Sequence, residues 1–223
     1  MPTNRKIVFA NEEYYHVFNR GLDRKSTFTD KNEYQRAVRL IKFYRHKNIP
    51  ARYSQLMNQP IETRIKNLEL IFNSTRIIDI VCYCLMPNHF HFLLKQLSDN
   101  GIPKFVSNFT NAYTRYFNTK NVRTGPLFQG VFKAVHIESD EQLIHLSRYI
   151  HINPAVSSVV SEQELEYYPW SSYPEYLEKQ SSQVCQKESV SSSFKTPSEY
   201  KGFVTDQIEY GKQLDAIKHL MLE

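Results

Sequence analysis

The sequence predicts an α+β fold: a ferredoxin-like, split βαβ arrangement with an antiparallel sheet and with helices on one face. Three observations favour this class. Segments of alternating apolar residues, typical of strands, are interleaved with two long segments in which apolar residues recur at helical spacing. Their order is strand, helix, strand, strand, helix, strand, which is the order of the split βαβ motif. The 223 residues also suffice for one sizeable hydrophobic core.

The first half of the chain supplies the first helix and three of the strands. Residues 14–21, YYHVFNRG, are typical of a strand that ends in a glycine turn. A long helix is expected after Asp30, which is a suitable N-cap residue. Residues 49–74 predict a loop and a short helix. Residues 76–96 then predict two strands joined by a tight Met-Pro-Asn turn.

The second half supplies the remaining elements. Residues 102–118 predict a second long amphipathic helix, and residues 125–139 contain another strand. A further helix is expected over residues 140–151. The pair Asn153-Pro154 should end it, because the residue before a proline disfavours the helical conformation.

The composition changes near residue 178. Residues 178–198 are rich in serine and glutamine and are typical of a linker. Residues 199–223 have one apolar side, formed by Ile208, Leu214, Ile217 and Leu220, which predicts a C-terminal amphipathic helix. We therefore predict a main domain over residues 1–177, followed by the linker and the terminal helix.

Charge and cysteine content narrow the class of protein. The formal net charge of +5 permits a nucleic-acid partner without requiring one. The odd count of three cysteines and the lack of a signal-peptide pattern indicate a reducing, cytoplasmic environment. No apolar run approaches the roughly 18 residues of a membrane helix. These features argue against a disulfide-rich secreted protein and against a membrane protein.

Two histidines, His89 and His91, lie within an otherwise apolar strand in the stretch CYCLMPNHFHFLLK. Side chains alternate along a strand, so both imidazoles project from one face, about 7 Å apart, and Phe90 and Phe92 from the other. Two imidazoles at this spacing can share a metal ion, and we interpret them as a candidate metal site. A third ligand must come from elsewhere. The alternative is that both histidines have only a structural role.

Five segments occur in the order YYHVFNRG, LMPNHFHFLL, GPLFQGVFKAVHI, LSRYIHINPA and YPWSSY. Together they resemble the single-tyrosine HUH transposases, or IS200-like transposases, and in particular the REP-associated tyrosine transposases. The resemblance extends from about residue 13 to residue 176, which is most of the chain. HUH denotes histidine, hydrophobic residue, histidine, here His89, Phe90 and His91.

The resemblance implies a transposase that cleaves and rejoins single-stranded DNA next to hairpins. A tyrosine attacks the phosphodiester, the 3′ oxygen leaves, and the 5′-phosphotyrosine bond is retained for rejoining. The implied cofactor is Mg²⁺ or Mn²⁺, although imidazole ligands alone would also admit Zn²⁺ or Ni²⁺. A cation suits this chemistry because phenol, with a pKa of about 10, is a weak nucleophile at neutral pH. The resemblance also implies a bacterial, nucleoid-associated protein in the cytoplasm, and it leaves a monomer and a homodimer open.

The family pattern places the nucleophile on the helix after the last strand, which here indicates Tyr149. An amide one turn later acts as the third metal ligand, and Asn153 stands at that position. Better-studied relatives have glutamine there, which is longer by one methylene. Tyr113 and Tyr116, on the preceding helix, are the alternative nucleophiles.

Basic and aromatic residues are candidate DNA contacts. The expected phosphate contacts are Arg20, Arg24, Lys25, Arg115, Lys120, Arg123 and Lys133, and the expected stacking residues are Phe128 and Trp170. Arg20 and Arg123 are favoured because they lie in family-like segments, whereas a solvated surface charge is the alternative for each. His136 and His145 match no metal position of the family. A structural hydrogen bond is the expected role of His16.

Three other functions remain as alternatives. A domesticated relative would cleave and rejoin chromosomal repeats without moving its own gene. A catalytically idle hairpin-DNA-binding protein would not need His89, His91, Tyr149 and Asn153 together. A metal oxygenase of the double-stranded β-helix type also uses His-x-His, but it requires an all-β pattern that the predicted helices contradict.

Overall fold

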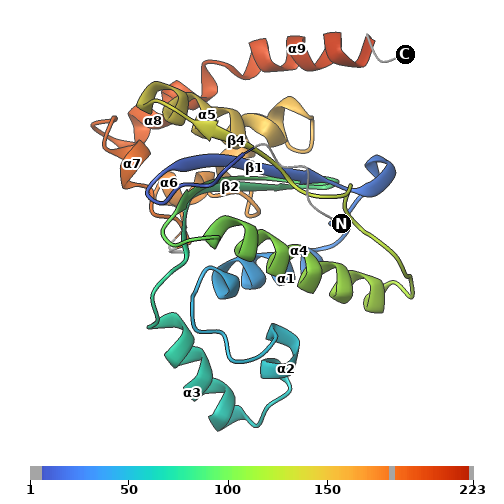
Figure 1. The fold of residues 1–223 in the computed structure, drawn as a ribbon. Helices are drawn as coiled ribbons and strands as arrows, with labels where there is room; N and C mark the ends of the chain where they lie inside the picture. Colours follow the sequence, from blue (N-terminus) through green and yellow to red (C-terminus); the bar gives the residue numbers. More distant parts are fainter. Residues whose placement is uncertain (1–6, 181–183, 221–223) are drawn as a thin grey trace.

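The computed structural model describes residues 7–180 and 184–220. Its centre is a four-stranded antiparallel sheet with the spatial order β2-β3-β1-β4 (Figure 1). The strands are β1 (Tyr14–Arg20), β2 (Ile78–Met86), β3 (His89–Gln96) and β4 (Lys133–Ile137). This order, with β3 between β2 and β1, confirms the predicted split βαβ class.

Helices lie on both faces of this sheet. One face is covered by α1 and α4, and α5 lies on the other face with α8 and α9 beyond it (Figure 1). The helices are α1 (Lys31–Tyr44), α2 (Tyr53–Met57), α3 (Ile61–Phe72), α4 (Gly101–Lys120), α5 (Asp140–Val156), α6 (Tyr173–Tyr176), α7 (Glu188–Ser191), α8 (Pro197–Thr205) and α9 (Ile208–Leu220). Short 3₁₀ turns occur at Leu22–Arg24 and Leu165–Tyr167.

The prediction that helices cover only one face of the sheet is therefore wrong. The physical reason is visible in β2, whose sequence IDIVCYCLM is almost continuously apolar and whose residues are buried nearly throughout. A strand of this kind needs cover on both faces. None of the helices within residues 7–180 and 184–220 is long and apolar enough to cross a membrane.

The face toward α4 is an aromatic core. Phe90 and Phe92 of β3 both contact Phe109 of α4, with ring centroids 5.4 and 5.5 Å apart. Asp30 caps α1 as predicted, because its carboxylate accepts a hydrogen bond of 3.0 Å from the Glu33 amide. The predicted loop and short helix before β2 are resolved into two helices, α2 and α3.

Helix α5 continues beyond its predicted end. Asn153 and Pro154 were expected to terminate it, yet it extends to Val156. A proline in a helix costs about 3 kcal/mol, because it lacks an N–H and because its ring clashes with the carbonyl group of the preceding turn. Asn153, Pro154 and Ala155 are all buried, and the amide of Ser157 donates to the Asn153 carbonyl at 2.9 Å. Tertiary packing therefore outweighs the local preference and keeps Asn153 on the helix.

The predicted linker packs against the domain from Val184 onward. Val184 and Val190 are fully buried, and the amide of Gln186 donates to the Ile80 carbonyl of β2 at 2.8 Å. The segment thus adds to the cover of β2 and includes helix α7. Parts of the predicted segments lie outside the described residues, namely residues 1–6, 181–183 and 221–223.

The predicted C-terminal helix is two helices, α8 and α9. Ile208 of the expected apolar side is buried, whereas Leu214 is 40% exposed. The expected apolar residues Ile217 and Leu220 belong to α9, but their side chains lie outside the described part of the structure.

A buried polar network joins α8 to the back of α5. The hydroxyl of Tyr200 lies 2.7 Å from Nδ1 of His151 and donates to Oγ of Ser147 at 3.0 Å. Nε2 of His151 lies 2.8 Å from Oγ of Ser172. Burial lowers the pKa of His151 to about 3, so this ring is neutral at physiological pH. The network fixes the C-terminal segment to the helix that carries Tyr149.

Replacing Tyr200 by Phe should lower the free energy of unfolding by about 1–3 kcal/mol, because buried groups of His151 and Ser147 lose their hydrogen-bonding partner. Urea denaturation measures this change. Tyr210→Phe is the matched control, since Tyr210 is 58% exposed on α9 and its replacement should have little effect. Equal stabilities of the two variants would contradict the structural role of the network.

Candidate active site

Three histidines gather on the α5 face of the sheet. His89 and His91 alternate with Phe90 on β3, and His16 lies on the neighbouring strand β1. Nε2 of His16 is 2.9 Å from Nδ1 of His91, and the two rings stack with centroids 5.1 Å apart. The predicted hydrogen-bonding role of His16 is thus confirmed, and its partner is one of the two candidate metal ligands.

Both β3 histidines have Nδ1 engaged. Nδ1 of His91 faces His16, and Nδ1 of His89 lies 2.6 Å from Oδ1 of Asn88. The sequence pattern indicates Asn88 only as a turn residue, although its position directly before the histidine pair is a signal for this contact. A histidine whose Nδ1 is held by a neighbour presents Nε2 as its ligand atom. The surroundings therefore orient two Nε2 atoms for an external partner.

Burial keeps these imidazoles neutral. It lowers the pKa of His16 to about 4 and that of His91 further below its ordinary value. Burial and the charge of Arg20 likewise lower the pKa of His89 to about 4. Because a protonated imidazole cannot bind a metal, the depressed pKa values maintain lone pairs for coordination at neutral pH.

Helix α5 brings Tyr149 to the histidines. The Tyr149 ring lies edge-on to His91, with centroids 5.6 Å apart, and its centroid is 6.1 Å from that of His16. Tyr149 is 46% exposed, so a substrate can reach this residue from solvent. The predicted tyrosine and the predicted histidine pair thus meet within one chain.

Asn153 follows one turn after Tyr149. Its Nδ2 donates to the Tyr149 carbonyl at 2.7 Å, which leaves Oδ1 for other contacts. Burial has the largest effect on the pKa of His89 and lowers it, whereas the hydrogen bond with Asn153 acts to raise it. A hydrogen-bond acceptor has this effect on a histidine, because it stabilises the protonated ring. Asn153 is therefore beside the ring with which it was predicted to share a metal ion.

The donor set fits a divalent cation. A neutral His89 that donates from Nδ1 to Asn88 has only a lone pair at its other nitrogen, and Asn153 presents a carbonyl oxygen to the same ring. Two acceptor atoms that face each other with no proton between them can both bind a metal ion. Within residues 7–180 and 184–220 no group of three His, Cys, Asp or Glu side chains is arranged to hold a metal. The candidate ligands instead are two histidines, His89 and His91, and the side-chain amide of Asn153.

Basic residues surround the outer end of this site. Arg20 stands directly opposite His89 in the β1–β3 register and is exposed. Arg24 and Lys25 follow in an exposed turn, which is tied to the β2–β3 turn because Asn88 donates to the Arg24 carbonyl at 3.2 Å. Lys133 is exposed on the edge strand β4. The structure thus places these four predicted phosphate contacts in exposed positions, with Arg20 closest to the imidazoles.

Several predicted DNA contacts have other partners. Arg123 donates to Asn118 and to the Pro126 carbonyl, both at 2.9 Å, and so fixes its own loop. Phe128 is only 6% exposed and packs against Phe90, on the opposite face of the sheet from the histidines. The structure does not support a stacking role for Phe128, because its ring is used in the core.

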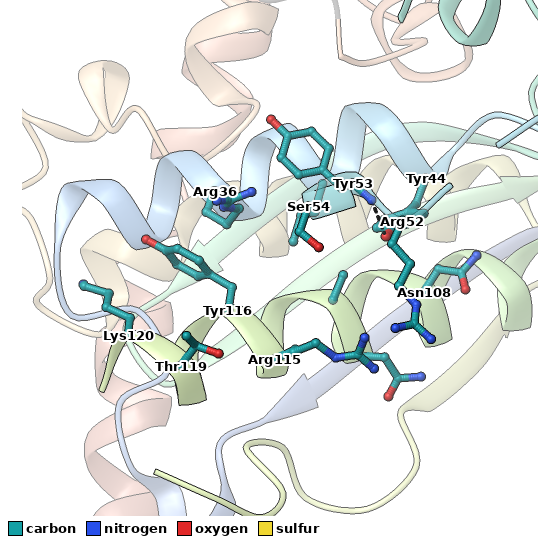
Figure 2. Close-up of a pocket in the computed structure, with 13 residues that line it drawn as sticks. Arg36, Tyr44, Arg52, Tyr53, Ser54, Asn108, Arg115, Tyr116, Thr119 and Lys120 are labelled. Carbon is teal, nitrogen blue, oxygen red and sulfur yellow. Dashed lines mark hydrogen bonds between the residues drawn. The ribbon is translucent and has the colours of Figure 1, made fainter. Parts of the chain in front are cut away.

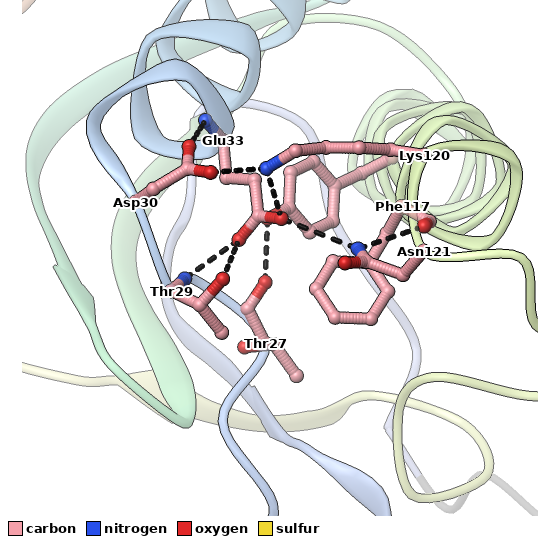
Figure 3. Close-up of polar contacts among 8 residues, drawn as sticks. Thr27, Thr29, Asp30, Glu33, Phe117, Lys120 and Asn121 are labelled. Carbon is pink, nitrogen blue, oxygen red and sulfur yellow. Dashed lines mark hydrogen bonds and ion pairs between the residues drawn. The ribbon is translucent and has the colours of Figure 1, made fainter.

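Lys120 and Trp170 also have structural partners. Lys120 pairs with Asp30 and, at 2.7 Å, with the fully buried Glu33 (Figure 3). Burial alone would raise the pKa of Glu33, but hydrogen bonds from Lys120 and Thr29 lower it. This cluster fastens the end of α4 to the start of α1. The Trp170 ring stacks on Tyr34, with centroids 4.8 Å apart.

The alternative nucleophiles lie elsewhere. Tyr113 is fully buried on the α4 side of the sheet, where its hydroxyl donates to the Thr27 carbonyl at 2.5 Å. Burial strongly raises the pKa of Tyr113, which further disfavours a phenolate. Tyr116 lies on the same helix beneath Arg36, whose guanidinium is 4.6 Å from the ring centroid. Of the three tyrosines, Tyr149 is the one beside the histidine pair.

The family model for IS200-like transposases matches residues 44–153, a range that includes His89, His91, Tyr149 and Asn153. The chain belongs to the IS200-like transposase family. It is accordingly a transposase, a type of enzyme that cleaves DNA. No curated protein matches the chain.

Two solved structures are similar to the chain. A REP-associated tyrosine transposase, determined bound to a REP hairpin, has a TM-score of 0.51 and 15% identity, over 79% of this chain and 86% of that chain. At this identity the likeness establishes the fold of the transposase. A candidate transposase from Deinococcus radiodurans matches at a TM-score of 0.34 and 17% identity, over 67% of this chain and 95% of that chain.

The buried histidines predict a loss of stability in acid. In the metal-free transposase, the unfolded chain binds protons below about pH 6.5, whereas folded His16 and His89 bind them only near pH 4. The free energy of unfolding should therefore fall between pH 7 and pH 5, by up to about 2 kcal/mol for each such histidine. Urea denaturation in EDTA at both pH values measures this fall.

The variant His16→Phe should show a smaller acid-induced loss of stability than the wild type, because it has one fewer histidine to protonate on unfolding. His136→Phe is the matched control on β4, where the ring is partly exposed and pairs with Glu13 at 3.0 Å. A pH dependence unchanged by His16→Phe would show that this ring does not titrate in the way that burial requires.

Proposed function

We propose that this transposase cleaves and rejoins single-stranded DNA next to hairpins through a 5′-phosphotyrosine intermediate on Tyr149. The observation that carries the proposal is the meeting of Tyr149 with His91 in one chain, at a ring distance of 5.6 Å. The hairpin in the structure of the REP-associated relative supports hairpin DNA as the substrate.

The hydroxyl oxygen of Tyr149 attacks the phosphorus of the scissile phosphodiester. A bond forms between this oxygen and phosphorus, and the bond from phosphorus to the 3′ oxygen breaks. The departing oxygen keeps the electron pair and takes a proton from water, while the phenolic proton passes to solvent, which the 46% exposure of the side chain permits. The number of phosphoester bonds is unchanged, so a free 3′ hydroxyl can reverse the reaction and rejoin a strand.

His89, His91 and Asn153 would hold Mg²⁺ or Mn²⁺. When bound, the cation supplies stabilisation of the phenolate and of the charge that develops on the phosphate. The chain contributes the orientation of the ligands, through the contacts of Asn88 with His89 and of His16 with His91. Burial of the imidazoles keeps them unprotonated for this task.

Cationic side chains bind the phosphates on either side of the scissile bond. Arg20 is nearest, because its charge is felt by both His89 and His91. Arg24 and Lys25 extend the positive surface along the adjoining turn. The tyrosine and the candidate ligands belong to one chain, so a monomer possesses a full set of catalytic groups.

The proposal predicts a covalent protein–DNA adduct. The purified transposase should be incubated with Mn²⁺ and labelled hairpin oligonucleotides taken from the DNA flanking its gene, and analysed on a denaturing gel. Wild-type protein should retain label, and Tyr149→Phe should reduce it by at least about 100-fold, because no oxygen remains to attack phosphorus. Tyr210→Phe is the control and should form the adduct normally, because Tyr210 is 58% exposed on α9 and belongs to neither proposed DNA site.

An adduct that persists in Tyr149→Phe would assign the nucleophile to another tyrosine. Tight hairpin binding without an adduct in the wild type would indicate the catalytically idle DNA-binding protein instead.

A second prediction concerns metal affinity. Calorimetric titration with Mn²⁺ should show binding that His91→Ala abolishes. His16→Phe should weaken it by about 10–100-fold, because the ring that orients His91 loses its hydrogen-bonding nitrogen while its stacking surface remains. His136→Phe should bind Mn²⁺ like the wild type. Unaltered Mn²⁺ binding by His91→Ala would exclude this site as the metal centre.

A further inference from the structure

A groove of about 810 Å³ lies on the side of the α1–α4 layer that faces away from the sheet, with α2 at one end (Figure 2). It is far from the histidines, because the helix layer and the sheet, each on the order of 10 Å thick, lie between them. Three arginines line it from three different helical segments, namely Arg36 of α1, Arg52 before α2 and Arg115 of α4.

Acidic side chains do not neutralise the three arginines of the groove, whereas Lys120, which also lines it, pairs with Asp30 and Glu33. No aspartate or glutamate lines it, and none of the three arginines forms an ion pair with a carboxylate in the described part of the chain. The other polar groups are neutral donors and acceptors, including Asn108, Asn111 and Thr119 of α4. Such a lining suits an anion with many oxygens, as in a sugar–phosphate backbone.

Aromatic rings adjoin these charges. The Arg36 guanidinium lies 4.6 Å from the centroid of the Tyr116 ring and 5.1 Å from that of Tyr53 (Figure 2). These contacts hold the guanidinium at the groove without occupying it in a salt bridge. Cationic grooves with aromatic walls are typical of sites for single-stranded nucleic acid, where bases stack and phosphates meet arginine.

The chain itself connects this groove with the catalytic site. The loop of residues 21–30 begins next to Arg20, beside the histidines, and ends at Asp30, whose carboxylate contacts Lys120 at one end of the groove. Arg24 and Lys25 are exposed along the loop. A strand that leaves the catalytic site around this end of the sheet therefore meets positive charge before it reaches Arg36 and Arg115.

We propose that the α1–α4 groove is a second DNA site, which binds the single strand that flanks the cleaved hairpin. The inference rests on the proposed function for the nature of the substrate, but it concerns a different set of residues. The groove holds the flanking strand by its phosphates and by base stacking, while the catalytic site acts on the scissile bond.

The test is fluorescence anisotropy of the full-length protein in EDTA, which prevents cleavage, with a bare hairpin and with the same hairpin carrying a long single-stranded extension. The groove variant is Arg36→Ala with Arg115→Ala. The matched control is Arg39→Ala with Lys104→Ala, since both residues are exposed on the same two helices but outside the groove.

The groove variant should bind the extended hairpin about 10-fold or more weakly than the control variant, and should bind the bare hairpin equally well. Its slope of log affinity against log salt should fall by about 0.7 for each phosphate that the variant no longer binds. A 5-iododeoxyuridine placed in the extension should crosslink to α4 or α2 in the wild type, as mass spectrometry of the peptides would show.

Equal affinity of the groove and control variants for the extended hairpin would overturn the proposal. Equal weakening for the bare hairpin would also overturn it, by assigning the groove to the paired stem. Stronger binding of a hairpin with an RNA extension than of one with a DNA extension of the same sequence would also overturn the proposal. An adduct formed by the wild type in Mn²⁺ shows that the catalytic proposal stands even if the groove fails. If the groove variant binds the extended hairpin more weakly but the wild type forms no adduct, the groove proposal stands and the catalytic proposal fails.

Discussion

The two-sided burial of β3 is the constraint on which the rest of the structure depends. The strand lies between β2 and β1, so its neighbours fix it on both edges. Its side chains alternate between an aromatic core under α4, formed with Phe90 and Phe92, and a polar site under α5, formed with His89 and His91. A shift of register by one residue would exchange these two sets, leaving imidazoles in the apolar core and phenylalanines at the site. The core therefore enforces the position of the candidate metal ligands.

Helix α5 completes the site because tertiary packing overrides its local sequence. Pro154 should end the helix, but burial of the following residues maintains it and keeps Asn153 on the same face as Tyr149. The buried contacts of His151 with Tyr200 then hold the helix from behind. The C-terminal segment, which the sequence indicates only as a linker and a helix, thus supports the helix that carries the candidate nucleophile Tyr149. This support explains how a half-exposed tyrosine is held close to the buried His91.

The electrostatic design separates two tasks. At the candidate active site, burial removes charge from the imidazoles, and cationic side chains remain at its rim, where Arg20 faces the solvent. In the α1–α4 groove, arginines remain unneutralised on the outside of the helix layer. Lys120, at one end of this groove, is instead bound to Asp30 and Glu33 and fastens the helices together. Basic residues that look alike in the sequence therefore differ in their neighbours: some are candidate phosphate contacts, and others, such as Lys120, stabilise the fold.

The sequence by itself determined the fold class, the pairing of His89 with His91 on one face, and the spacing of Tyr149 and Asn153 on one helix, because these follow from the periods of strands and helices. Only the tertiary structure decided which face of the sheet α5 covers, that His16 binds His91, that Phe128 is buried, and that Arg36 and Arg115 share a groove. Such facts depend on contacts between residues far apart in the chain. Local periodicity contains no information about these contacts. They form where the free energy of burial exceeds the local conformational preference of the chain.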